Sequence, residues 1–268
     1  MSLKFVKAHA CGNDFLVIEE AEARGRHVAM AQKLCARNTG IGADGIEFLD
    51  RRADGSFFLR LFNADGSEAE LSGNGTRCVA AWLAKSEGVM QVALGTHGGV
   101  RSCSVKEQRG AEWWIESGMG VPRVMPRKIE IDDVGVVDGA MVNVGNPHYV
   151  IFVESEDFSA HGLSWQELGA KIAIDPLFKF GTNVEFVKVL GEGEIAFRIY
   201  ERGCGPTTSS GTGTCASSAA AMTLRGVARE LTAIAQGGAQ RVVWPDAASE
   251  MMLTGPAEII CTGEVEFA

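Results

Sequence analysis

Two short phrases of the chain place a hydroxyl and glycines at the expected start of a helix. Ser72-Gly73-Asn74-Gly75-Thr76 lies in the first half and Ser210-Gly211-Thr212-Gly213-Thr214 in the second, each followed by a small, apolar, helix-prone run. Such a start gathers a side-chain oxygen and several free backbone N–H groups at one point, which suits an anion. Two such points predict two halves that contact one small-molecule substrate from both sides.

The same residues also have a purely structural interpretation. Serine is a favoured helix N-cap and glycine is common in the turn before a helix, so one phrase alone would indicate only a helix start. Neither phrase has the third glycine of a dinucleotide-binding loop or the Gly-Lys-Ser/Thr ending of a phosphate loop. The recurrence of the phrase in equivalent contexts favours a binding function.

Composition excludes several classes of protein. The 268 residues are 46% hydrophobic and carry a net charge of −9, so no basic surface for nucleic acid is expected. Charges interrupt every candidate membrane span, and the N-terminus lacks the apolar core of a secretion signal. The seven cysteines form no C-x-x-C pair, which predicts reduced thiols in a cytoplasmic protein. His, Asp and Glu do not cluster at ligand spacings, so no metal is expected. No organic cofactor is expected either, because pyridoxal would need an active-site lysine with a phosphate loop, for which the sequence makes no case.

The residue pattern predicts an α/β chain with many short strands and two principal helices, one per half. Prolines at positions 122 and 126 predict a linker between the halves. We expect helices at 27–37, 73–87, 163–173 and 211–224. We expect strands near 4–9, 15–18, 45–49, 56–63, 140–144, 149–153, 183–190, 194–200, 239–244, 250–254 and 258–261, and short strands with turns between 91 and 119.

Over nearly its whole length the chain resembles the diaminopimelate epimerase family, whose members invert one stereocentre of diaminopimelate without a cofactor. The matching motifs, in chain order, are His9-Ala10-Cys11-Gly12-Asn13-Asp14-Phe15, Gly40-Ile41-Gly42-Ala43-Asp44, Phe62-Asn63-Ala64-Asp65-Gly66-Ser67-Glu68, Gly73-Asn74-Gly75-Thr76-Arg77-Cys78, Gly145-Asn146-Pro147-His148, Asn183, Tyr200-Glu201-Arg202-Gly203, Gly211-Thr212-Gly213 and Thr254-Gly255-Pro256-Ala257.

The resemblance implies two pseudo-symmetric α/β (α+β) domains, each a curved, mostly antiparallel sheet around a central helix, with the active site in the cleft between them. On this basis residues 1–118 form the first domain, residues 119–256 form the second, and a terminal strand at 257–268 returns to the first. The resemblance also suggests a homodimer. Its activity belongs to the synthesis of lysine and peptidoglycan precursors.

The family uses two cysteines, a thiolate base and a thiol acid, on opposite faces of the substrate α-carbon. Ser72 and Ser210 occupy those two positions here, while Cys78 and Cys215 resemble the family's packed, structural cysteines. A thiol has a pKa near ~8.5, whereas a serine hydroxyl is far less acidic and a poor base without a partner. We therefore expect a preserved pocket and impaired epimerisation.

The remaining site residues are carried over by the same resemblance. His148 and Glu201 match polar neighbours that tune the two catalytic groups. The residues expected to bind substrate are Asn13, Asn63, Asn146, Asn183, Glu201 and Arg202, together with Gly73, Asn74, Gly211 and Thr212, whose backbone N–H groups would hold the reacting carboxylate. Gly45 and Pro206 replace a glutamine and a glutamate that are usual in the family, so the distal group of the substrate stays open.

Three functions remain open on the sequence. The first is an epimerase-like isomerase impaired by its two serines. The second is a serine-based isomerase, racemase or dehydratase of another amino acid. The third is a non-catalytic amino-acid-binding homologue.

Overall fold

The computed structural model describes residues 2–267, which divide into two compact units. The first unit contains residues 1–118 and 254–268, and the second contains residues 119–253. The terminal segment thus joins the first unit from Thr254, three residues earlier than the sequence predicts.

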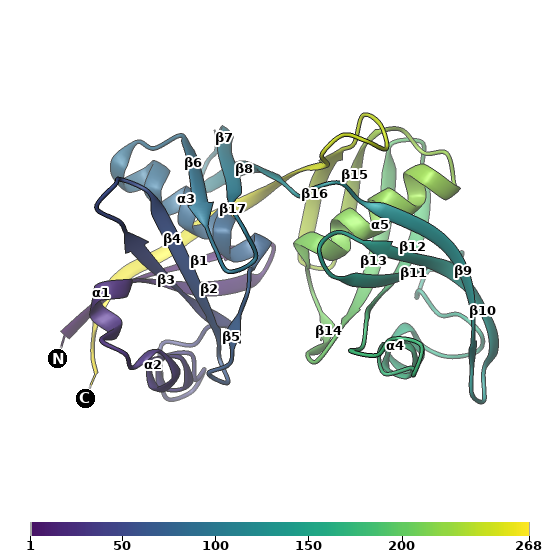
Figure 1. Ribbon diagram of the computed structural model, residues 1–268, viewed down its shortest axis with the longest axis horizontal. Coiled ribbons are helices and arrows are strands. Elements are labelled where there is room, and N and C mark those ends of the chain that lie inside the picture. The colour runs from purple at the N-terminus through teal and green to yellow at the C-terminus, as the bar shows by residue number, and fades with distance from the viewer. Residues whose placement is uncertain (1, 268) are drawn as a thin grey trace. The chain divides into compact units, whose positions relative to one another are not determined.

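The first unit wraps its strands around helix α3 (Figure 1). Its helices are α1 (Glu20–Ala23), α2 (His27–Leu34) and α3 (Gly73–Glu87). Its strands are β1 (Ser2–Ala10), β2 (Asn13–Glu19), β3 (Gly45–Arg51), β4 (Phe57–Asn63), β5 (Glu68–Ala69), β6 (Gln91–Gly95), β7 (Arg101–Arg109), β8 (Glu112–Gly118) and most of β17 (Met252–Glu266). Helix α3 contacts β1, β2, β3, β6, β7 and β8, so its small residues are buried on nearly every side.

The second unit repeats this arrangement around α5 (Figure 1). Its helices are α4 (Trp165–Ala173) and α5 (Gly211–Leu224). Its strands are β9 (Arg123–Ile131), β10 (Gly135–Asn143), β11 (Pro147–Phe152), β12 (Asn183–Gly191), β13 (Glu194–Glu201), β14 (Gly205–Thr207), β15 (Glu230–Ala235) and β16 (Gly238–Val243). A helix of alanine, serine and glycine can be buried on all sides because its thin surface lets strands approach closely.

Strand pairing shows that the two units are repeats of one another. In the first unit β2 pairs parallel with β3, β3 antiparallel with β4, and β4 parallel with β6. In the second unit β11 pairs parallel with β12, β12 antiparallel with β13, and β13 parallel with β15. Gly45 on β3 lies opposite Asn63 on β4. In each unit a short strand, β5 or β14, separates the antiparallel pair from the glycine phrase that begins the central helix.

Three expectations about the elements are wrong. Residues 123–131 form strand β9 rather than a linker, with Pro126 opposite Ala140 on β10. A proline is tolerated in a strand at a sheet edge or where its missing N–H is not needed for pairing. The strands expected at 250–254 and 258–261 are one continuous strand, β17, and the helix expected at 27–37 ends at Leu34.

Candidate active site

Both serines of the glycine phrases are helix N-caps. Ser72 Oγ accepts a hydrogen bond from the Gly75 N–H at 3.0 Å, and Ser210 Oγ accepts one from the Gly213 N–H at 3.2 Å. Both serines are in extended backbone conformation and partly exposed. This capping consumes one acceptor site of each hydroxyl and leaves the N–H groups of the first helical residues available for a ligand.

The second glycine of each phrase makes room for a buried carboxyl group. A Cβ on Gly75 would lie 1.9 Å from Glu47 Oε1, and a Cβ on Gly213 would lie 2.6 Å from Ile199 Cδ1 and 3.1 Å from Glu185 Oε1. Glu47 is 1% exposed and Glu185 is 0% exposed. Each unit therefore holds one carboxyl group directly beneath the first turn of its central helix.

Sequence reasoning missed both of these glutamates. A signal for them exists in the sequence, because each starts a Glu-Phe pair and precedes its serine, Ser72 or Ser210, by 25 residues. Glutamate within an apolar strand is unusual enough to flag, since an ionisable side chain is rarely buried without a partner.

A methyl group at the second glycine should be costly in the first unit. We expect Gly75→Ala to destabilise the protein by about 2–3 kcal/mol, because the added Cβ overlaps the Glu47 carboxyl group. Gly193→Ala is the matched control, since a Cβ there meets no atom within 4 Å. Urea denaturation measures both. An equal, small effect of the two substitutions, or no relief of the Gly75→Ala penalty by Glu47→Ala, would contradict the assignment.

The two buried carboxyl groups have different surroundings. Burial raises the pKa of Glu47 to about 8, and its Oε1 atom has no hydrogen-bond partner. Burial also raises the pKa of Glu185, but there the neighbouring His148 opposes the effect. His148 Nδ1 lies 2.6 Å from Glu185 Oε1, and both side chains are fully buried. The second unit therefore holds a His–Glu pair where the first unit holds a lone acid.

A chain of hydrogen bonds connects this pair to Ser210. His148 Nε2 lies 2.9 Å from Asn146 Oδ1, and Asn146 Nδ2 donates to Thr212 Oγ1 at 3.3 Å. Thr212 Oγ1 in turn lies 3.4 Å from Ser210 Oγ. With this orientation of the amide, Nε2 of the imidazole carries a proton, because the carbonyl oxygen can only accept. Hydrogen bonds in the second unit thus connect Glu185, which the sequence analysis did not single out, to four residues that it expected at the site: His148, Asn146, Thr212 and Ser210.

Breaking the His148–Glu185 pair should be strongly destabilising. We expect Glu185→Leu to cost about 3–5 kcal/mol, since it leaves the imidazole buried without its partner. The double variant His148→Leu/Glu185→Leu should cost clearly less than the sum of the single variants. The coupling is obtained from a double-mutant cycle in urea, and additive effects would mean that the two groups do not interact.

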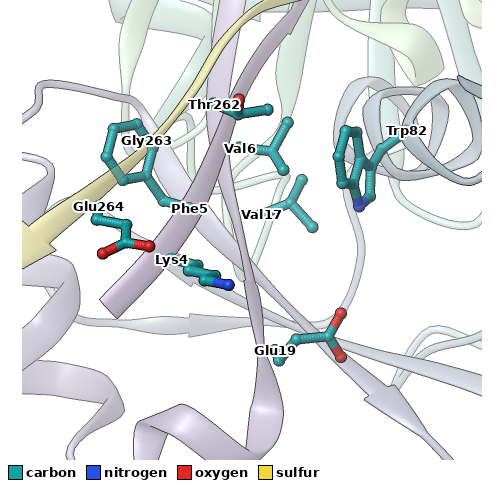
Figure 2. A pocket seen from close by; sticks show the side chains of 9 residues that line it. All are labelled: Lys4, Phe5, Val6, Val17, Glu19, Trp82, Thr262, Gly263 and Glu264. Atoms are coloured by element: carbon teal, nitrogen blue, oxygen red, sulfur yellow. The ribbon is translucent and has the colours of Figure 1, made fainter. Parts of the chain in front are cut away.

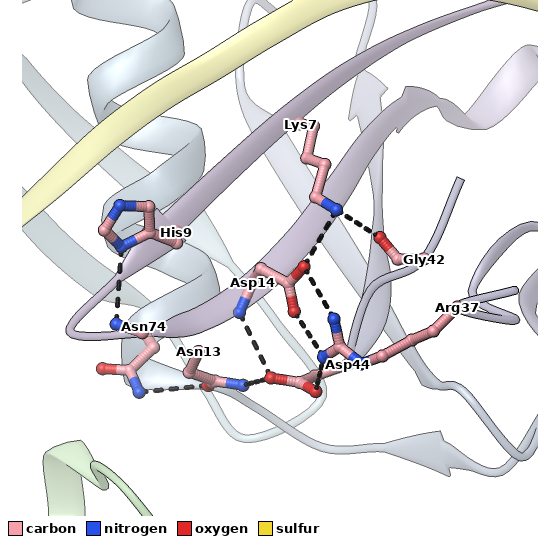
Figure 3. A network of polar contacts seen from close by, with 9 residues as sticks. Lys7, His9, Asn13, Asp14, Arg37, Gly42, Asp44 and Asn74 are labelled. Atoms are coloured by element: carbon pink, nitrogen blue, oxygen red, sulfur yellow. Dashed lines mark hydrogen bonds and ion pairs between the residues drawn. The ribbon is translucent and has the colours of Figure 1, made fainter. Parts of the chain in front are cut away.

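Asn13 and Asn74, both expected to bind substrate, contact each other in the first unit. Asn74 Nδ2 donates to Asn13 Oδ1 at 3.0 Å, and Asn13 Nδ2 donates to Asp44 Oδ2 at 2.6 Å (Figure 3). The buried Arg77 donates to Asn74 Oδ1 at 2.5 Å, and its Nε and Nη1 atoms have no partner. The side-chain amides of both asparagines are thus held by fixed charges.

Asp14 anchors the rest of this network. Burial alone would raise the pKa of Asp14, but hydrogen bonds from Arg37 and Lys7 outweigh it and keep the pKa below its usual value. Arg37 also contacts Asp44 at 2.7 Å (Figure 3). The network fixes the turn that carries Asn13 beside the start of α3.

The residues expected at the distal end of the substrate are less tightly grouped. Asn63 is exposed and donates to Ser67 Oγ, and Asn183 Oδ1 accepts from the Arg202 backbone N–H at 3.0 Å. The exposed Arg202 guanidinium donates to the Phe180 carbonyl oxygen and lines a pocket of about 580 Å³. Glu201 Oε1 accepts from Thr207 Oγ1 at 2.7 Å.

A second pocket, of about 360 Å³, lies in the first unit (Figure 2). Phe5, Val6, Val17 and Trp82 give it an apolar wall, and no residue of the expected site lines it.

Cys78 and Cys215 are fully buried, and burial raises the pKa of the Cys78 thiol far above its usual value. Over residues 2–267 no group of His, Cys, Asp and Glu side chains is arranged to hold a metal ion, and no helix is long and apolar enough to cross a membrane.

Comparison with known proteins identifies this chain as an isomerase of the amino-acid epimerase class and also identifies its family. The family model for diaminopimelate epimerase matches residues 5–125 and again residues 140–260, once in each half. The diaminopimelate epimerase of Synechocystis sp. is 34% identical over 284 residues, covering 99% of this chain and 100% of the relative. That of Bacteroides thetaiotaomicron is 34% identical over 275 residues and 98% of both chains. The chain therefore belongs to the diaminopimelate epimerase family.

Solved structures agree on the fold. A phenazine biosynthesis protein of the PhzF family from Bacillus anthracis superposes with a TM-score of 0.75 over 100% of both chains, at 14% identity. A hydroxyproline epimerase from Agrobacterium vitis superposes with a TM-score of 0.71 over 98% of this chain and 91% of the other, at 15% identity. At these identities the likeness concerns the fold alone.

Proposed function

We propose that this protein is a diaminopimelate epimerase-like isomerase whose two half-sites act on the α-carbon of one amino-acid substrate. The observation that carries the proposal is the pair of helix starts capped by Ser72 and Ser210, at equivalent places in a chain of which a family member covers 99%. Its place in metabolism is then the synthesis of lysine and peptidoglycan precursors. A cytoplasmic location and a homodimer are part of the same proposal.

The two helix starts supply the electrostatics of the reaction. The N–H groups of Gly73 and Asn74 on α3, and of Gly211 and Thr212 on α5, hold the reacting carboxylate. The positive ends of both helices favour the negative charge that develops when the α-proton leaves. This stabilisation does not depend on whether position 72 or 210 carries a hydroxyl or a thiol.

Proton transfer is the weak part of this site. A two-base reaction needs a group on one face of the α-carbon to take the proton and a group on the other face to return one. Ser72 and Ser210 titrate far from neutral pH, so each is a poor base and a poor acid. His148 is linked to Ser210 only through Asn146 and Thr212, and its Nε2–H donates to Asn146 Oδ1, so it does not take the Ser210 proton in this arrangement. We therefore propose slow turnover with intact binding.

The distal group of the substrate is assigned to Asn63, Asn146, Asn183 and Arg202, with Glu201 beside them. Amides can accept from an ammonium and donate to a carboxylate, while a guanidinium favours a carboxylate. Gly45 leaves no side chain at its strand position, where a Cβ would lie 2.8 Å from the Phe62 carbonyl oxygen. Diaminopimelate is the proposed substrate, and an amino acid with another distal group is the nearest variation.

Two measurements test the proposal. Calorimetry against the isomers of diaminopimelate, lysine, glutamate and histidine shows which distal group is bound. Exchange of the substrate α-proton in deuterated solvent shows whether any base works. Binding of diaminopimelate with slow exchange supports the proposal, whereas no binding of any diaminopimelate isomer overturns it.

The His148–Glu185 pair favours one alternative, a serine-based isomerase of another small amino acid, because it places an acid–base pair without a thiol in hydrogen-bond contact with Asn146 of this half-site. In that case exchange would be rapid with a different ligand of the panel. Tight binding of an amino acid without any exchange would instead indicate a binding protein.

A further inference from the structure

Glu47 is a buried acid that neither the resemblance nor the proposed chemistry uses. Its carboxyl group lies against the Cα of Gly75, beneath the first turn of α3, and its Oε1 atom has no hydrogen-bond partner. An unpartnered polar atom in this position is costly, because burial removes its hydration without replacing it.

The strand neighbours of Glu47 cannot balance a negative charge. It lies opposite Val17 on β2 and Leu61 on β4, and the next residues on the same face of β3 are Gly45 and Leu49. All of these are apolar or lack a side chain. These neighbours therefore favour the neutral, protonated carboxyl group over the carboxylate.

The other elements packed on this face add few charges. Helix α3 contributes the guanidinium of Arg77, which donates to Asn74, and the thiol of Cys78; strand β7 contributes the thiol of Cys103. Burial raises the pKa of both thiols, so neither ionises near neutral pH. Strand β1 faces α3 with Val6, Ala8 and Ala10.

The equivalent carboxyl group of the second unit is neutralised in another way. Glu185 pairs with His148, whereas the residue at the His148 position in the first unit is Phe15, which lies opposite Gly45 just as His148 lies opposite Asn183. The first unit thus keeps its buried carboxyl group without a basic partner. Only protonation can keep it neutral.

We propose that Glu47 is a positioning residue for the first half-site: its protonated form keeps the start of α3 attractive to the substrate carboxylate, and its ionisation weakens that attraction. The inference rests on the proposed function, which places a carboxylate at this helix start. A negative charge beneath the first turn opposes the helix dipole and repels an anion bound above it. The repulsion grows as charge develops on the carboxylate, so the reaction suffers more than binding does.

The test is the pH dependence of ligand affinity in the full-length protein. Calorimetry with meso-diaminopimelate from pH 6.5 to pH 9.5 should show wild-type affinity falling roughly 10-fold or more relative to Glu47→Gln. The ligand's own titration is common to both proteins and cancels in this ratio. Glu47→Met, which suits the apolar surroundings, should behave like Glu47→Gln, and Glu47→Asp should retain the pH dependence. Glu87→Gln, at the exposed far end of α3, is the matched control and should follow the wild type.

The outcomes separate the two proposals. Parallel pH profiles for wild type, Glu47→Gln and Glu47→Met would overturn the role of Glu47 and leave the proposed function standing. If neither wild type nor Glu47→Gln binds any diaminopimelate isomer, the proposed function falls and this inference falls with it. A purely structural Glu47 would change affinity equally at every pH, which also counts against the proposal.

Discussion

The double variant Ser72→Cys/Ser210→Cys will exchange the substrate α-proton with solvent about 10²–10⁴-fold faster than the wild type, which is the range that a well-placed acid or base contributes. A cysteine thiol has a pKa near ~8.5, and the start of a helix lowers it further. Both serines cap such helix starts, so a thiolate would replace each hydroxyl where it is stabilised. Deuterium incorporation into diaminopimelate, followed by NMR, measures the rate.

The single variants make this expectation sharper. In a two-base reaction each group removes the proton from only one of the two stereoisomers, so Ser72→Cys and Ser210→Cys should each accelerate exchange with a different isomer. Ser86→Cys, on the exposed end of α3, is the matched control and should change nothing. A double variant that binds diaminopimelate and remains inert would rule out the epimerase mechanism.

Replacing Glu47 will change how stability depends on pH. In the unfolded chain a glutamate has a pKa near ~4.3, while in the folded protein burial raises the pKa of Glu47 to about 8. Between these values the folded state holds a proton that the unfolded state has lost. Stability therefore falls as pH rises through this window, by up to about 1.4 kcal/mol per pH unit, and the loss is complete above the folded pKa.

Glu47→Met removes this term. Relative to the wild type, the variant should gain about 3–4 kcal/mol of stability between pH 5 and pH 8. Urea denaturation at both values measures the difference, and contributions of other groups cancel in it. Glu87→Gln, at the exposed end of α3, should show no such gain. A constant difference between Glu47→Met and wild type at the two pH values would show that Glu47 does not keep its proton in the folded protein.

Local sequence signals accounted for the central helices and most strands. Ser72 and Ser210 are N-caps because a short hydroxyl side chain before a helix satisfies a free N–H group, and this depends on neighbours within three residues. The long strand β17 and the strand at 123–131 have no clear local signal, because their prolines and turn residues indicate a break in the chain's regular structure. Pairing with distant strands decided both.

The sequence by itself determined the family, the duplicated helix start and the absence of both expected cysteines, because each of these depends on residue type and order. Only the tertiary structure brought Glu47 beneath Gly75 and Glu185 beneath Gly213. Each glutamate precedes the N-cap serine of its helix by 25 residues in the sequence, so the two meet only because the strand packs against the helix. It also decided that one carboxyl group has a histidine partner and the other has none. Burial and partners, which no single-residue pattern encodes, set the protonation of both.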